Sequence, residues 1–165
     1  MKVRVESIAT SAGVQALPHP RAILDAAERL GRLDDLGRST RAAACAPLAQ
    51  APPGCVLFVN LHARDLMDDL LVSPKSPLSA VANRVVLEIT ERASLERVKD
   101  VRAKIAELRR MGFRIAIDDL GAGYAGLTSF ATLEPEFVEL DMSLVRDIDH
   151  NHTKATVRPK PTTPA

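Results

Sequence analysis

The chain of 165 residues lacks tryptophan, has a single tyrosine and carries a formal net charge of only +1. With so few aromatic rings, a surface that stacks nucleic-acid bases is not expected. Because the net charge is close to zero, no strong overall field attracts nucleic acid or anionic lipid. We therefore expect neither a nucleic-acid partner nor a membrane partner.

Long apolar runs are also missing, so the sequence predicts no membrane span and no signal peptide in residues 1–13. Cys45 and Cys55 have no His or Cys neighbours at metal-ligand spacing, which favours two buried free thiols. These features predict a cytoplasmic protein. Apolar residues make up 46% of the chain, which suits one globular domain with one core.

Three zones follow one another along the chain. Residues 1–18 show no clear periodicity and form a poorly defined segment. Residues 19–149 alternate helical and strand-like segments, which indicates an α/β domain. Residues 150–165 contain three prolines and no apolar period, which predicts a disordered tail.

Four apolar segments in the middle zone are expected to be strands, and helical segments separate them. Strands that are apolar throughout are covered on both faces, and strands joined by helices form a parallel sheet. Such a series fits either an open doubly wound sheet or half of a barrel. The expected strands are 56–60, 84–89, 113–118 and 137–141. The expected helices are 21–33 (with Ile23, Leu24, Ala27 and Leu30 on one face), 34–48, 94–111 (capped by Ser94 and stopped by Gly112), 126–133 and 143–148.

An oxygen-bearing side chain stands at the end of each expected strand. In parallel α/β folds the carboxyl ends of the strands meet at one edge, where sites are built. Carboxylates gathered there repel one another unless a cation lies among them, and oxygen ligands favour Mg²⁺ or Mn²⁺. Two such ions could activate water against a phosphodiester. The alternative is that each acid caps the following helix. The residues are Asn60, Glu88, Glu91, Asp118, Asp119, Glu139 and Asp141.

A glycine motif competes with this interpretation. Gly121, Gly123 and Gly126 match the G-x-G-x-x-G pattern of dinucleotide-binding loops, and Asp141 follows at the end of the next strand. However, the two aspartates before the motif would face a pyrophosphate without a cation, and Pro135 leaves room for a short helix only. We therefore favour a flexible loop beside a metal site.

Four segments resemble, in order and spacing, the EAL-type cyclic di-GMP phosphodiesterases: LFVNLHARDL, VVLEITER, FRIAIDDLGAGYAGLTSF and EPEFVELDMSLVRDID. The resemblance covers roughly residues 19–149. It implies a partial (β/α)₈ TIM-like barrel of about four to five parallel strands with helices. It also implies hydrolysis of cyclic di-GMP to pGpG with Mg²⁺ or Mn²⁺ as cofactor.

The same resemblance implies roles for particular residues. Asn60, Glu88 and Asp118 are implied to be metal ligands, with Asp119 beside a second ion. The segment Leu120–Thr128 is implied to contact a second copy of the chain or another EAL domain. Support of this loop and of the site is implied for Glu91, Gly121, Gly123 and Asp141.

Three departures from the family pattern predict weak hydrolysis or none. Gln15 is the nearest candidate for the signature Glu, and Glu139 stands where the family has its catalytic Lys. The family's last two strands have no counterpart, which suggests a truncated domain. Losing one such charged group typically slows a reaction by about 10²–10⁴-fold. The alternative function is a non-catalytic interaction module or a regulatory module of cyclic di-GMP signalling.

Overall fold

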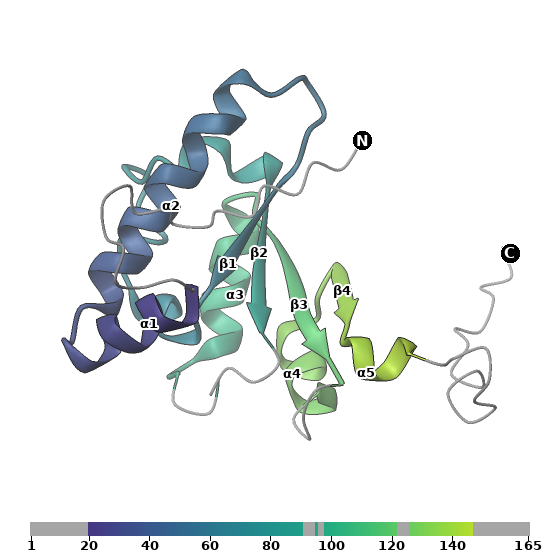
Figure 1. Cartoon of the computed structure of the whole chain (residues 1–165). Coiled ribbons are helices and arrows are strands. Elements are labelled where there is room, and N and C mark those ends of the chain that lie inside the picture. The colour runs from purple at the N-terminus through teal and green to yellow at the C-terminus, as the bar shows by residue number, and fades with distance from the viewer. Residues whose placement is uncertain (1–19, 91–94, 96–97, 122–125, 147–165) are drawn as a thin grey trace, which may run out of the picture.

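A computed structural model describes residues 20–90, 95, 98–121 and 126–146 (Figure 1). Within them, four parallel strands form one sheet in the order β1-β2-β3-β4. This arrangement confirms the predicted α/β fold with a parallel sheet. The elements are α1 (Pro20–Arg29), α2 (Leu33–Gln50), β1 (Leu57–Leu61), the 3₁₀ helices η1 (Ala63–Met67) and η2 (Ser79–Arg84), β2 (Val85–Thr90), α3 (Val101–Arg110), β3 (Arg114–Leu120), α4 (Gly126–Leu133), β4 (Phe137–Leu140) and α5 (Met142–Val145).

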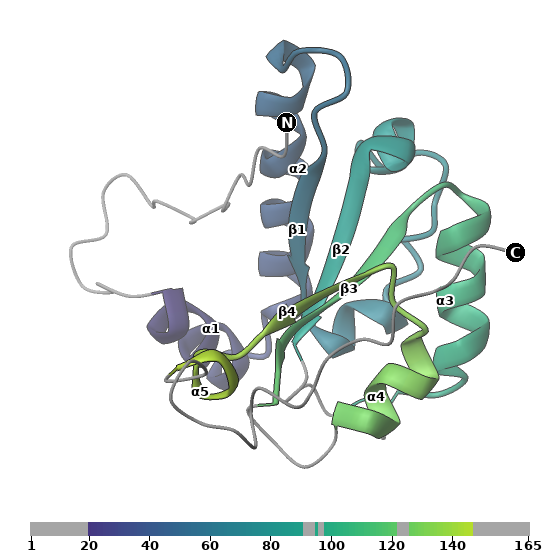
Figure 2. The same cartoon turned by 90° about the vertical axis from the view of Figure 1, so that its right-hand side faces the viewer.

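The outer face of the sheet carries the hydrophobic core. Alternate residues of each strand point to opposite faces, and one set from β1, β2 and β3 packs against α2, α3 and α4. Figure 2 shows α3 and α4 together on one side of β3. The buried set consists of Leu57, Val59, Leu61, Val85, Leu87, Ile89, Ile115 and Ile117 from the strands, with Ala44, Leu48, Ile105, Leu108 and Leu133 from the helices.

The inner face of the sheet is concave. The rings of Phe58 on β1 and Phe137 on β4 meet edge to face, with 5.7 Å between their centroids. In a flat sheet the first and fourth strands would lie about 14 Å apart, so the sheet must curve until these side chains point toward each other. Val86 and Ala116, on the two strands between them, are fully buried. This is the curvature of a barrel wall whose interior is filled by side chains.

Helix α3 is shorter than the sequence predicts. It begins at Val101 rather than at Ser94, which lies outside the described residues. The physical reason is that Asp100 adopts a left-handed backbone, with φ at 54°, which a continuous helix does not allow. The apolar period was nevertheless informative, because Leu95 and Val98 are buried ahead of the helix. Gly112, with φ at 102°, ends the helix as predicted.

Helix α1 does not bury its whole apolar face. Ala27 is buried, but Leu24 and Leu30 are 45% and 73% exposed. Figures 1 and 2 show the reason: α1 lies beyond the carboxyl end of β1, at the edge of the sheet instead of against its face. It therefore shapes the surroundings of that edge and adds little to the core.

Cys45 and Cys55 are free thiols, as predicted. Cys55 is buried as expected, but Cys45 is only half-buried. Burial raises the pKa of the Cys45 thiol. In the described part of the chain, no helix has the length and apolar character needed to cross a membrane.

Candidate functional site

The register of the strands brings the predicted oxygen donors to one edge of the inner face. Asn60 on β1 pairs directly with Glu88 on β2. Glu88 pairs in turn with Ala116 on β3, two residues before Asp118. Since side chains two residues apart share a face, Asn60, Glu88 and Asp118 all belong to the concave face at its carboxyl end.

An irregularity in β3 places two aspartates opposite one glutamate. Ile117 pairs with Val138, but the next printed pair is Leu120 with Leu140, so β3 has one more residue than β4 over this stretch. This is a β-bulge in which Asp118 and Asp119 together oppose Glu139. Asp119 adopts a positive φ of 58°, a conformation that Asp tolerates better than most residues. Like charges facing each other across strands destabilise a sheet.

The three donors differ in exposure. Glu88 is only 2% exposed, Asp118 is half-buried and Asn60 is exposed. Asp118 accepts a hydrogen bond on Oδ1 from the backbone N–H of Asp119, at 2.9 Å. Two carboxylates and one amide, in three different degrees of exposure, thus lie at the same edge of the sheet.

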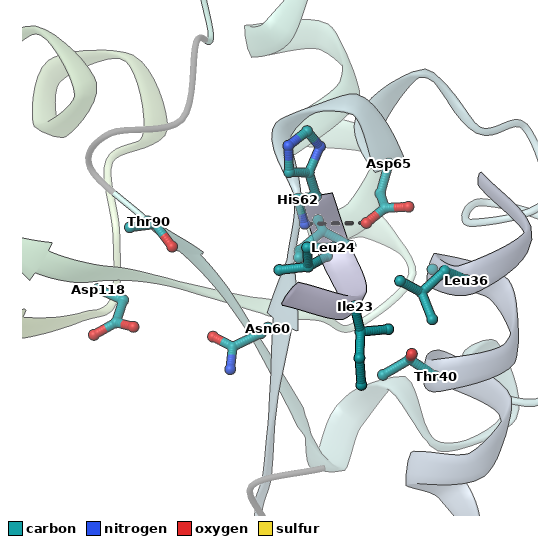
Figure 3. Close-up of a pocket in the computed structure, with 11 residues that line it drawn as sticks. Ile23, Leu24, Leu36, Thr40, Asn60, His62, Asp65, Thr90 and Asp118 are labelled. Atoms are coloured by element: carbon teal, nitrogen blue, oxygen red, sulfur yellow. Dashed lines mark hydrogen bonds between the residues drawn. The ribbon is translucent and has the colours of Figure 1, made fainter. Parts of the chain in front are cut away.

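A cavity of about 370 Å³ opens beside these donors. Asn60, Thr90 and Asp118 lie on the sheet side of it, while Ile23 of α1 and Thr40 of α2 lie on the other side (Figure 3). Its size is that of a small-molecule pocket, and it combines apolar walls with a few polar groups. Helix α1, which contributes little to the core, thus provides one wall of the cavity.

The donor chemistry fits a hard divalent cation, but the donor set is incomplete. Carboxylate and amide oxygens are the ligands that Mg²⁺ and Mn²⁺ prefer. Among residues 20–90, 95, 98–121 and 126–146, however, no group of three or more His, Cys, Asp and Glu side chains is placed to hold an ion. The edge thus offers only part of a metal site within the described residues.

Comparison with known proteins identifies the family of this chain. A family model described as EAL domain matches residues 9–159. The chain belongs to the EAL domain family. A Klebsiella pneumoniae BlrP1 structure, solved with calcium and cyclic di-GMP, superimposes on this chain with a TM-score of 0.68 and 29% sequence identity. The superposition covers 84% of this chain and 38% of the BlrP1 chain. The same protein with manganese and cyclic di-GMP gives the same TM-score.

Two sequence relatives are much longer than this chain. An Escherichia coli protein named "Probable cyclic di-GMP phosphodiesterase PdeA" is 37% identical over 44% of this chain and 10% of its own length. A Sinorhizobium fredii protein, "Uncharacterized protein y4lL", is 29% identical over 88% of this chain and 19% of its own length. The chain therefore spans less than a fifth of these relatives.

The remaining predicted site residues of the EAL domain have different outcomes. Asp141 caps α5, accepting a hydrogen bond on Oδ1 from Ser143 N at 2.7 Å, so the capping alternative describes this residue. Gly121 has a φ of 101°, and a Cβ there would overlap the side chain of Leu144. Loop Leu120–Thr128 is described only at its two ends. Gln15, Glu91 and Gly123 lie outside the described residues.

One charged cluster beside the cavity was missed by sequence reasoning. Arg38 and Arg41 of α2 form ion pairs with Asp65 and Asp68, which lie in and just after η1. The two arginines are three residues apart in the sequence, and so are the two aspartates. This helical spacing could have suggested two facing rows of opposite charge. Nothing local, however, indicates that segments about 25 residues apart meet here.

Proposed function

We propose that this EAL domain binds cyclic di-GMP at the carboxyl edge of its sheet and hydrolyses it weakly or not at all. The observation that carries the weak or absent hydrolysis is the bulge, in which Glu139 stands opposite Asp118 and Asp119. Three carboxylates share the space where the family resemblance implies a lysine. Phosphate groups bind to cations and to N–H donors, so this reversal of charge disfavours the substrate as well as the reaction.

Several features support retained binding. The donors Asn60, Glu88 and Asp118 share one face, and the cavity beside them has room for a small ligand. Asn60, Glu88 and Asp118 would contribute oxygen ligands to a divalent ion, Mg²⁺ or Mn²⁺, whose positive charge would offset the carboxylates beside a phosphodiester. The predicted cytoplasmic location, which stays a prediction, would suit an intracellular nucleotide.

The proposal is tested by replacing Glu139 with lysine, the residue that the family resemblance implies at this position. Cyclic di-GMP is incubated with the purified chain and either Mn²⁺ or Mg²⁺, and pGpG is measured by chromatography, with affinity measured in parallel by calorimetry. We expect no hydrolysis, or a trace of it, for the wild type. Glu139→Lys is expected to tighten binding at least about tenfold, because it changes the local charge by two units beside a phosphate. Rapid hydrolysis by the wild type would contradict the proposal.

A matched variant controls for overall charge. Asp69→Lys makes the same change of charge at a carboxylate that is 95% exposed and lies outside the cavity lining. If binding responds to the local field, this variant leaves the affinity within about twofold of the wild type. Equal gains from Asp69→Lys and Glu139→Lys would show that only net charge matters.

A second candidate function is a non-catalytic interaction module. It is favoured by exposed apolar side chains on consecutive elements at the β4 end of the sheet, namely Phe130, Val138, Leu140, Met142 and Leu144. Contiguous exposed apolar surface commonly marks an interface. Together with loop Leu120–Thr128, it would contact a second copy or another EAL domain. Light scattering at increasing concentration tests this, with Leu140→Lys expected to abolish association.

A further inference from the structure

The charged cluster behind the cavity combines four ionised side chains in two forked pairs. The guanidinium of Arg41, 6% exposed, donates from Nη1 to Asp65 Oδ1 at 2.6 Å and from Nη2 to Asp68 Oδ2 at 2.5 Å. Arg38 is nearer the surface and donates to both oxygens of Asp68, at 2.9 and 3.1 Å. Two positive and two negative groups balance each other, so the cluster can be buried.

Asp65 connects this cluster to the edge that holds the donors. While its Oδ1 accepts from Arg41, its Oδ2 accepts from the backbone N–H of His62 at 3.0 Å (Figure 3). His62 is the N-cap of η1 and comes two residues after Asn60. The carboxylate of Asp65 thus ties the chain just beyond β1 to helix α2.

The cavity wall is made by the same residues. Asn60, His62, Asp65 and Gly37 all line it. At Gly37, a Cβ would overlap Asp65 Oδ1 and lie 2.9 Å from Arg41 Nη1, so α2 approaches the cluster closely only because this residue is glycine. A shift of Asp65 would therefore move the wall next to Asn60.

We propose that Arg41 is a positioning residue of the site: through Asp65 and the backbone of His62, it fixes where Asn60 presents its amide. Its fork is required because one planar group must reach two carboxylates at once, which a lysine ammonium does less well. Arg38, in contrast, donates to Asp68, just beyond η1, and among the described residues no hydrogen bond joins it to Asp65. The consequence for ligand affinity rests on the proposed function; the consequence for His62 does not.

The first experiment needs no ligand. Hydrogen exchange of the His62 amide is followed by NMR in the wild type, Arg41→Lys and Asp65→Asn. We expect exchange at least about tenfold faster in both variants, while the amides of Leu87 and Ile89 in the central strand keep their rates. Arg64→Ala is the control, since Arg64 lies on η1 but pairs with Asp34 at the surface. It should leave His62 unchanged.

The second experiment measures affinity for cyclic di-GMP in the presence of Mn²⁺. Arg41→Lys is expected to weaken binding about tenfold and Arg64→Ala by less than twofold. If the wild type does not bind, the proposed function fails, while the exchange rates still decide the role of Arg41. Should Arg41→Lys accelerate His62 no more than the central-strand amides, or leave the His62 rate unchanged, the positioning role is overturned.

Discussion

Strands β2 and β4 each carry a glutamate on the inner face, yet they surround it differently. β2 is buried at five of its six positions and pairs with strands on both sides. β4 alternates half-buried and exposed residues and, within the described chain, pairs with β3 alone. Glu88 is consequently shielded from water, whereas Glu139 is half-buried. A strand at the edge can accept a reversed charge that a central strand could not.

The largest expected effect tests this difference in burial. Ile89→Ala in β2 removes a fully buried side chain and should lower the free energy of unfolding by about 2–5 kcal/mol. Leu140→Ala in β4, at a position 54% exposed, should change it by less than about 0.5 kcal/mol. Urea unfolding followed by circular dichroism measures both. A similar loss for Leu140→Ala would mean that β4 is covered in solution.

A smaller effect is expected from the two glutamates themselves. Glu88→Gln should abolish any stabilisation of the fold by Mn²⁺, because a neutral amide replaces a buried carboxylate at the donor edge. Glu139 is half-buried, and Glu139→Gln should raise the free energy of unfolding by less than about 0.5 kcal/mol, because it relieves repulsion by Asp118 and Asp119. Thermal melts with and without Mn²⁺ measure these shifts, and equal responses would remove the distinction between the strands.

The smallest effect concerns the acid dependence at the start of β4. Burial acts to raise the pKa of Glu136, but hydrogen bonds from Arg109 and from the backbone N–H of Ile115 outweigh it, so the pKa lies below its ordinary value. The resulting stability is present above the unfolded pKa, about 4.3, and is lost as the pH falls through the folded pKa. It is worth less than about 1 kcal/mol, because the carboxylate is partly exposed and screened by solvent.

The measurement compares unfolding free energies at neutral and at acid pH. Glu136→Gln should make the loss of stability on acidification smaller than in the wild type. Glu28→Gln, at an exposed position of α1, serves as the control and should follow the wild type. If Glu136→Gln left the pH dependence unchanged, the Arg109 pair would not contribute to folding.

Patterns local to the chain predicted the central elements well. The four apolar strands and the glycine stop at Gly112 follow from period, burial and turn chemistry, so they were visible in the sequence. The start of α3 was not, because a single left-handed residue at Asp100 interrupts an unbroken apolar period. Likewise α1 has the apolar stripe of a core helix, but its position at the sheet edge leaves Leu24 and Leu30 exposed.

The candidate site was predictable in composition but not in geometry. Strand ends identified Asn60, Glu88 and Asp118, since parallel strands bring their carboxyl ends together. The bulge that sets Asp118 and Asp119 against Glu139 depends on pairing between two strands, which a single sequence does not contain. The same holds for the contact of Arg41 with Asp65, where the partners are 24 residues apart.

The aromatic contact across the concave face affects how a ligand can reach the site. Phe58 and Phe137 close the inner surface below Asn60, over the buried side chains of Val86 and Ala116. The aromatic pair therefore bounds the donor edge on the side of the amino ends of the strands, so a ligand would enter and leave over the carboxyl ends. Helix α1 lies at these carboxyl ends, and its displacement would widen or narrow the opening of the cavity.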